Sequence, residues 1–149
     1  MSSHLPLDTL IGLAKEHADT AARALGRLNQ ERQHAEKQLE LLSDYRDDYL
    51  TRLQKTMISG MTASDCHNYQ CFITTLDDAI GQQVAALDTL NVNLEKSRLD
   101  WQQQQRKLNA FDTLAQREAR AARVIAERRE QRVNDEHSAR VATRRHSFY

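Results

Sequence analysis

Residues 69–101 read YQCFITTLDDAIGQQVAALDTLNVNLEKSRLDW, in which mostly apolar residues recur at alternating steps of four and three. This series extends to residue 125, and another with the same spacing occupies residues 7–56. A mean spacing of about 3.5 residues is typical of a left-handed coiled coil, because the stripe of a globular helix follows a period of about 3.6. We call these positions the seam residues: Leu7, Ile11, Ala14, Ala18, Ala21, Leu25, Leu28, Arg32, Ala35, Leu39, Leu42, Arg46, Tyr49, Leu53, Thr56, then Tyr69, Ile73, Leu76, Ile80, Gln83, Leu87, Leu90, Leu94, Ser97, Trp101, Gln104, Leu108, Phe111, Ala115, Glu118, Ala122 and Ile125.

The composition also favours an all-α protein. The chain has 149 residues, 40% of them hydrophobic and 28% charged, with four glycines and one proline. A mean hydropathy of -0.74 is too polar for a thick core but suits a narrow seam between helices. Alanine, leucine, glutamine, glutamate and arginine are strong helix formers, so we predict long helices and no sheet.

A turn is expected between the two series. Residues 57–65, MISGMTASD, combine a glycine with small polar side chains. Thr62 or Ser64 is expected to cap the following helix by accepting a hydrogen bond from its first backbone N–H groups.

Folding back at Met61 places residues whose numbers sum to 122 opposite one another. Every seam residue from 7 to 53 then faces a seam residue of the other series, which predicts an antiparallel hairpin within one chain. The pairs include Leu28 with Leu94, Leu42 with Ile80, Arg46 with Leu76 and Tyr49 with Ile73. We therefore expect a single domain, residues 1–149, with helices at about 5–57 and 64–134, a turn at about 58–63 and a frayed basic tail at about 135–149.

The sequence carries no motif of a nucleotide site, a zinc protease or a zinc ribbon. Cys66, His67 and Cys71 offer three metal-ligand types near the turn, but no fourth ligand follows at a useful spacing. No histidine lies with a nucleophile and a carboxylate at helical spacing. We expect no catalytic residues, no cofactor and no metal, and therefore no enzyme.

The amino terminus lacks a signal peptide pattern, and nowhere do roughly 18 apolar residues follow one another. Cys66 and Cys71 are five positions apart, so a helix points them to different sides and a local disulfide is not expected. These features indicate a water-soluble cytosolic protein without direct membrane insertion.

Apolar residues are in surplus near the turn. Two quartets at helical spacing line one side of each helix: Gln38, Leu42, Tyr45 and Tyr49, and Phe72, Leu76, Ala79 and Gln83. The seam cannot cover all of them, so Tyr45 and Phe72 are expected to face outward. Exposed aromatic side chains often form protein-binding patches. The alternative is that they only widen the local core.

The carboxyl-terminal segment is rich in arginine. Residues 116–149 hold nine arginines and five acidic residues, although the whole chain has a net charge of zero. In the predicted hairpin, residues beyond about 118 have no opposing helix. Such a segment is either a solvated, fraying end or a helix that is completed only inside an acidic partner.

Four segments together resemble the FliJ family of flagellar export proteins: ADTAAR at 18–23, QLELLSDYRDDY at 38–49, NYQCFITTLDDAI at 68–80 and RLDW at 98–101. The similarity extends from Leu7 to about Arg132. It implies a non-enzymatic antiparallel coiled coil that resembles the central stalk subunit of rotary ATPases and acts in bacterial type III flagellar export. It implies a cytoplasmic protein, peripherally associated with the inner-membrane export apparatus.

The resemblance also implies three partners. These are the hexameric flagellar export ATPase, the cytoplasmic domain of the membrane export gate protein, and the export chaperones of late substrates. The gate contact maps onto Gln38, Leu42, Tyr45, Tyr49, Phe72, Leu76 and Ala79, and the pattern departs at Gln83, where relatives carry histidine. We expect Arg117, Arg120, Arg123 and Arg128 to contact the ATPase ring.

Three other interpretations remain open at the level of sequence. The coiled-coil pattern alone fits a generic cytosolic adaptor or scaffold equally well. The terminal arginines fit a nucleic-acid-binding helix, although the zero net charge argues against it. The third interpretation is parallel dimerisation through each series separately, whereas the intramolecular hairpin predicts a monomer by itself.

Overall fold

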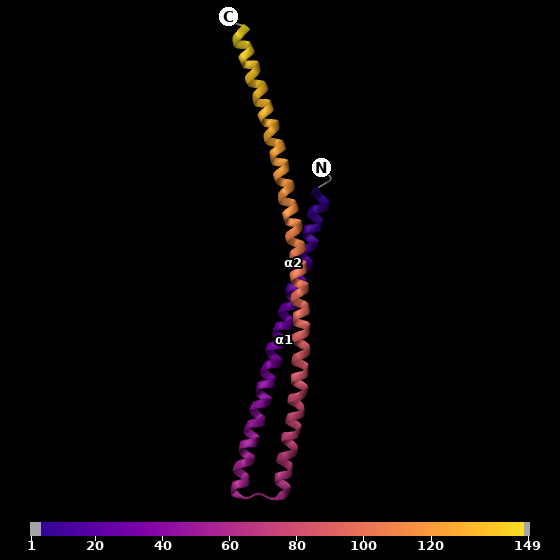
Figure 1. Cartoon of the computed structure of the whole chain (residues 1–149), viewed down its shortest axis with the longest axis vertical. Coiled ribbons are helices and arrows are strands. Elements are labelled where there is room, and N and C mark those ends of the chain that lie inside the picture. The colour runs from indigo at the N-terminus through magenta and orange to yellow at the C-terminus, as the bar shows by residue number, and fades with distance from the viewer. Residues whose placement is uncertain (1–3, 148–149) are drawn as a thin grey trace. The chain divides into compact units, whose positions relative to one another are not determined.

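The computed structural model describes residues 4–147 and contains two long helices within them, with no strand. Helix α1 spans His4–Ser59 (56 residues), and helix α2 spans Ala63–Ser147 (85 residues). Next to the short connection that joins them, the two helices extend to the same side and run in opposite chain directions (Figure 1). The all-α hairpin predicted from the seam spacing is confirmed.

The chain divides into two compact units, each described here by itself. The hairpin unit is Ala18–Gln103 and contains the connection between the helices. The terminal unit combines the described parts of Met1–His17 and Gln104–Tyr149. Each unit pairs a different stretch of α1 with α2, and the single domain expected from the sequence stays a prediction.

The connection is short because Gly60 terminates α1 and Thr62 caps the start of α2. Gly60 directly follows α1 and has a φ of 92°, a left-handed conformation that residues with a Cβ rarely adopt. The Thr62 hydroxyl accepts a hydrogen bond of 3.1 Å from the backbone N–H of Asp65. Thr62, one of the two caps predicted from the sequence, is therefore the amino-terminal cap of α2.

Seam residues in the hairpin unit are covered by the opposing helix. Ala18, Ala21, Ala35, Leu53 and Leu76 retain at most 9% of their accessible surface, and the other seam residues of this unit are half-buried. The neighbouring positions are mostly exposed. The spacing of the series therefore identified the buried side of each helix, because position in the repeat decides which side chains meet the partner helix.

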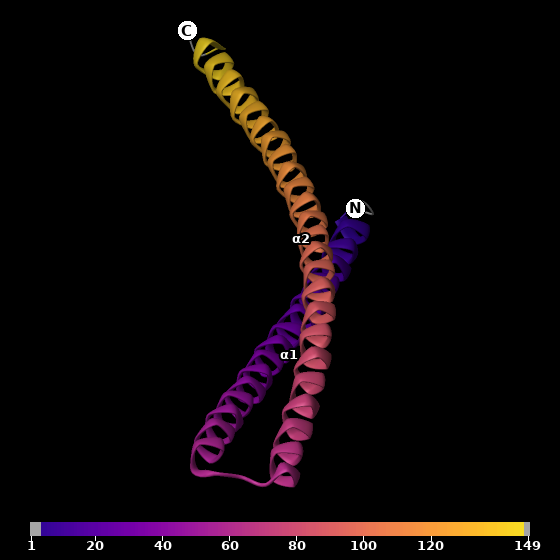
Figure 2. The same ribbon diagram turned by 60° about the horizontal axis from the view of Figure 1, so that its bottom comes forward.

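The distance between the helices follows the size of the seam residues. Within the hairpin unit, the ribbons lie closer together away from the connection and farther apart near it (Figures 1 and 2). At the end of the hairpin unit away from the connection, α1 carries Ala18 and Ala21. Near the connection, the aromatic side chains of Tyr49 and Phe72 lie between the helices. Small residues allow close approach and large ones separate the helix axes.

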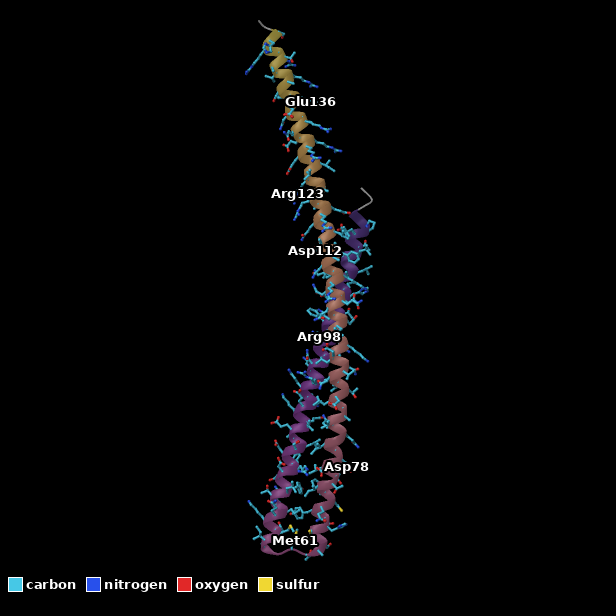
Figure 3. The ribbon with its side chains drawn as sticks, viewed as in Figure 1. Met61, Asp78, Arg98, Asp112, Arg123 and Glu136 are labelled. Atoms are coloured by element: carbon cyan, nitrogen blue, oxygen red, sulfur yellow. The ribbon has the colours of Figure 1, made fainter. Side chains whose placement is uncertain are left out.

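In the terminal unit, α1 covers only the first part of α2. Ala14 is 6% exposed, and Leu7, Ile11, Leu108, Phe111 and Ala115 are half-buried. Every residue of α2 from 116 to 147 is exposed, including the last three seam residues. Figure 3 shows Arg123 and Glu136 on this part of the helix, where no other described helix runs alongside.

The expected frayed tail is wrong for the residues that the structure describes, because α2 continues to Ser147. Residues 135–147 contain no glycine or proline, and an α-helix satisfies its backbone hydrogen bonds without a partner. Arg144, Arg145 and His146 lie in the last turn, where positive charge stabilises the negative end of the helix dipole. Residues 148 and 149 lie outside the described residues.

Neither helix, over its described residues, combines the length and the apolar run needed to cross a membrane.

Replacing Thr62 by alanine is expected to lower the free energy of unfolding by about 1 kcal/mol, because the backbone N–H of Asp65 loses its acceptor. Urea unfolding followed by circular dichroism measures this change. Thr62→Ser is the control, since it keeps the hydroxyl. Equal stabilities of the alanine and serine variants would contradict the capping role.

Candidate functional site

An aromatic cluster joins the two helices next to the connection. The ring of Tyr49 on α1 stacks against the ring of Phe72 on α2, with centroids 4.3 Å apart and planes inclined by 34°. The ring of Tyr69 also lies near that of Tyr49, with centroids 6.2 Å apart and planes inclined by 57°. Tilted and offset rings at such distances attract each other through dispersion and their quadrupoles. Tyr49 therefore holds Phe72 in a defined position at the edge of the seam.

The eight residues predicted to bind a partner lie on both helices of the hairpin unit, and we call them the aromatic face. They differ in exposure. Tyr45 and Phe72 are 55% and 41% exposed, and Gln38 is also exposed. Leu76 is only 8% exposed and is a core residue. The half-buried members are Leu42, Tyr49, Ala79 and Gln83.

Gln83 is directed across the seam. Its side-chain Nε2 donates a hydrogen bond of 3.0 Å to the backbone carbonyl of Ala35 and lies 3.4 Å from Oε1 of Gln38. Nε2 of Gln38 in turn lies 3.1 Å from Nε2 of His34. The structure thus brings Gln38 and Gln83 together, and much of the Gln83 amide is used within the hairpin.

Charged groups surround the aromatic face. The Arg46 guanidinium donates a hydrogen bond to the carboxylate of Asp77 on the opposite helix, and this bond and the carboxylate charge raise the pKa of Arg46. The Arg52 guanidinium lies 5.7 Å from the centre of the Tyr49 ring and 3.2 Å from the Asp48 carboxylate. The predicted pairs Tyr49–Ile73 and Arg46–Leu76 fall within one residue of the observed contacts to Phe72 and Asp77.

The predicted arginines lie in the terminal unit on the uncovered part of α2. Arg117, Arg120, Arg123 and Arg128 are all exposed. A shallow hollow nearby is lined by Ile125, Arg128, Arg129 and Arg132. The sequence argument named only Arg128 of these four. The sequence pattern that could have predicted this group is an apolar residue, Ile125, followed by arginines three, four and seven positions later, which lie on one side of a helix.

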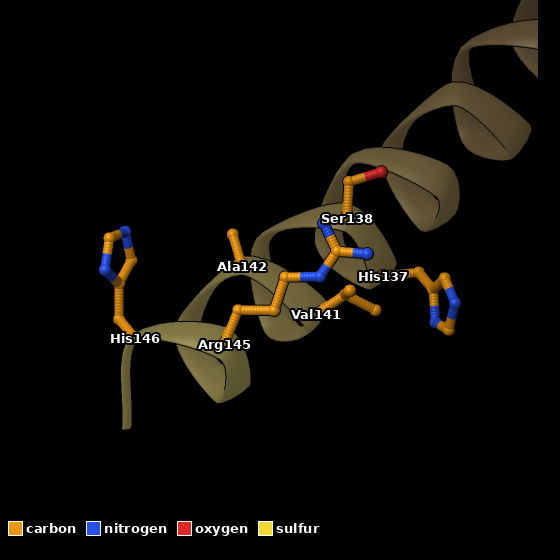
Figure 4. A pocket seen from close by; sticks show the side chains of 6 residues that line it. All are labelled: His137, Ser138, Val141, Ala142, Arg145 and His146. Carbon is orange, nitrogen blue, oxygen red and sulfur yellow. The ribbon is translucent and has the colours of Figure 1, made fainter. Parts of the chain in front are cut away.

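A second hollow lies near the end of α2 and is lined by His137, Ser138, Val141, Ala142, Arg145 and His146. Figure 4 shows that these side chains come from successive turns of one helix. Both hollows are therefore one-sided surfaces. A surface of this kind contacts a partner but does not enclose a small substrate.

Of the three possible metal ligands near the turn, only Cys71 and His67 have a described contact with each other. The Cys71 Sγ and the His67 Nε2 are 3.5 Å apart on adjacent turns of α2, and Cys66 is half-buried. Over the described range, no three histidine, cysteine or acidic side chains converge as they would around a metal ion.

The fold and these surfaces define a helical-hairpin protein whose candidate sites are open helix faces. The family model described as "Flagellar FliJ protein" matches residues 2–147, and the chain belongs to this family. It is 35% identical to the flagellar FliJ protein of Escherichia coli (strain K12) over 97% of this chain and 99% of that protein, and equally similar to that of Salmonella typhi. The flagellar FliJ protein of Buchnera aphidicola is 27% identical over 68% of this chain and 70% of its own length. No solved structure matches the chain.

Replacing Tyr49 by alanine is expected to lower the free energy of unfolding by about 2 kcal/mol, because both ring contacts and a half-buried side chain are lost. Tyr45→Ala is the matched control. That side chain is 55% exposed, so its removal should change stability by no more than about 0.5 kcal/mol. Thermal and urea unfolding measure both. Equal losses in the two variants would contradict the described difference in burial.

Proposed function

We propose that this chain is a non-enzymatic component of the bacterial flagellar type III export apparatus. In this proposal it is a coiled-coil stalk between the export ATPase ring and the membrane export gate, and it also handles export chaperones. One observation carries the proposal. In a member of the FliJ family, Tyr45 from α1 and Phe72 from α2 are both exposed on the hairpin unit.

The aromatic face is suited to binding the cytoplasmic domain of the export gate. Exposed aromatic rings bury a large apolar area on binding and have few side-chain torsions to restrict. Phe72 is already held by Tyr49, so part of the ordering cost is met before the partner arrives. Because the face uses both helices, a partner recognises the assembled hairpin rather than one isolated helix.

The arginine-rich part of α2 is suited to binding the hexameric export ATPase. Its guanidinium groups are exposed and already carried on a helix, so they can pair with acidic side chains lining a ring. Arg117, Arg120, Arg123 and Arg128 are the proposed contacts. The helical state of this segment means that binding needs less ordering than a disordered tail would require.

The proposed mechanism is differential contact. If the ATPase binds the arginines more tightly in one nucleotide state, binding energy becomes available for a change elsewhere in the complex. Helix α2 contributes residues both to the arginine segment and to the aromatic face. A two-state coupling between the sites then requires that each partner favours a particular arrangement of this helix. In this role the chain is cytoplasmic, peripherally associated with the export apparatus, and monomeric before assembly.

Replacing Tyr45 and Phe72 together by alanine is expected to abolish capture of the purified gate domain, because the exposed aromatic area is lost. The matched control replaces Leu41 and Val92 by alanine, since both are 54% exposed and lie outside the aromatic face. A pull-down measures binding, and circular dichroism checks helicity. Unchanged capture by the Tyr45 and Phe72 variant, with intact helicity, would refute the gate contact.

Reversing the charges of Arg117, Arg120, Arg123 and Arg128 to glutamate is expected to weaken binding to the export ATPase at least about tenfold, because several ion pairs become repulsive. Reversal of Arg23, Arg27, Arg106 and Lys107, which are also exposed, is the control for total charge. Gel filtration and a titration at constant salt measure the change. Equal weakening by both sets would indicate a general charge effect, and binding of the wild type to duplex DNA but not to the ATPase would favour a nucleic-acid role.

A further inference from the structure

Two groups of polar side-chain contacts cross the seam of the hairpin unit close to the aromatic face. Nε2 of Gln83 donates to the carbonyl of Ala35, at 3.0 Å, and contacts Gln38. Arg46 pairs with Asp77. We call these two groups the register contacts. Gln83 of α2 contacts two nearby positions of α1, and Asp77 of α2 contacts one.

The apolar seam does not by itself select one alignment of the helices. Its residues recur every seven positions, so a slip of one repeat again places seam residues opposite seam residues. Such a slip moves one helix along the other by about 10 Å. The three-residue connection opposes the slip, but unwinding the end of either helix would supply the extra chain.

The register contacts do not tolerate that slip. Moving α2 by seven residues separates Asp77 from Arg46 and moves the Gln83 amide away from the carbonyl of Ala35. A hydrogen-bonded polar side chain at a seam position specifies alignment in coiled coils, often at some cost in stability. The side chains of Arg46 and Asp77 are 36% and 48% exposed, and such pairs contribute little to stability. The main effect of the Arg46–Asp77 pair is therefore on the alignment of the two helices, because the pair forms only when these two residues are opposite each other.

We propose that Gln83 and the Arg46–Asp77 pair are positioning residues that fix the alignment of α1 and α2 and so assemble the aromatic face. They hold Gln38 and Tyr45 of α1 beside Phe72 and Ala79 of α2. Gln83 acts from inside the hairpin, through Ala35 and Gln38. This inference concerns the free chain and does not depend on which protein binds the face.

The test measures distances within the free full-length chain. Spin labels are placed at the exposed positions Lys37 and Lys96 by Lys37→Cys and Lys96→Cys, after Cys66→Ser and Cys71→Ser remove the native thiols. The chain without further change should give one narrow distance distribution. The variant Gln83→Leu with Asp77→Asn should add a second population of roughly one tenth or more, whose label distance differs by up to about 10 Å.

Measuring thermal stability separates two roles for these residues: fixing the alignment of the helices and stabilising the fold. Leucine at position 83 adds apolar surface to the seam, so the midpoint of thermal unfolding should stay the same or rise while the distances become heterogeneous. A single unchanged distance in this variant would overturn the proposal and show that the connection alone sets the alignment.

Two further variants complete the test. Arg46→Asp in the Gln83→Leu background should also give two distances, and adding Asp77→Arg should restore most of the single population by re-forming the pair in reverse. Glu95→Gln is the matched control, because it breaks an ion pair of similar exposure, with Arg98, that lies within α2 and does not cross the seam. Heterogeneity in this control equal to that of the register variants would also overturn the proposal.

Discussion

The whole structure depends on the lengthwise packing of α1 against α2. A two-helix seam is narrow, and no described side chain reaches the nearly complete burial found in the centre of a globular core. Each seam residue therefore contributes a modest amount of apolar burial, and stability accumulates through the number of repeats. In the terminal unit, α2 extends past the first residues of α1. Its residues 116–147 are exposed there and remain helical through their local backbone hydrogen bonds.

Stability and alignment have different origins in this hairpin. Alanine and leucine supply the burial, but their repetition every seven residues makes neighbouring alignments similar in energy. The connection, with Gly60 in a left-handed conformation and Thr62 as the cap, limits where the chain reverses. The polar contacts of Gln83 and Arg46 require particular partners across the seam, Ala35 and Asp77. Residues of small energetic effect therefore decide which side chains share a face.

A narrow seam also determines the kind of function the chain can support. Large side chains that the opposing helix cannot cover remain accessible, as Tyr45 and Phe72 do, and the uncovered part of α2 presents its arginines in the same way. Membership of the FliJ family places these open surfaces in a flagellar protein. The hollows found among the described residues are each lined by one helix, and such open surfaces suit contact with another protein.

The sequence by itself determined the helices, the buried side of each and the reversal near Met61, because these depend on local propensity and on position within the repeat. It offered Thr62 as one of two caps and an outward position of Tyr45 and Phe72 as one of two alternatives, and the structure chose between them. Only the tertiary structure decided that Tyr49 stacks on Phe72, that Arg46 pairs with Asp77 and that the Gln83 amide is bound to Ala35 and Gln38. Periodicity identifies the side of a helix that meets its partner. Which atoms meet there depends on the axial alignment and the separation of two helices, and neither is a property of one helix alone.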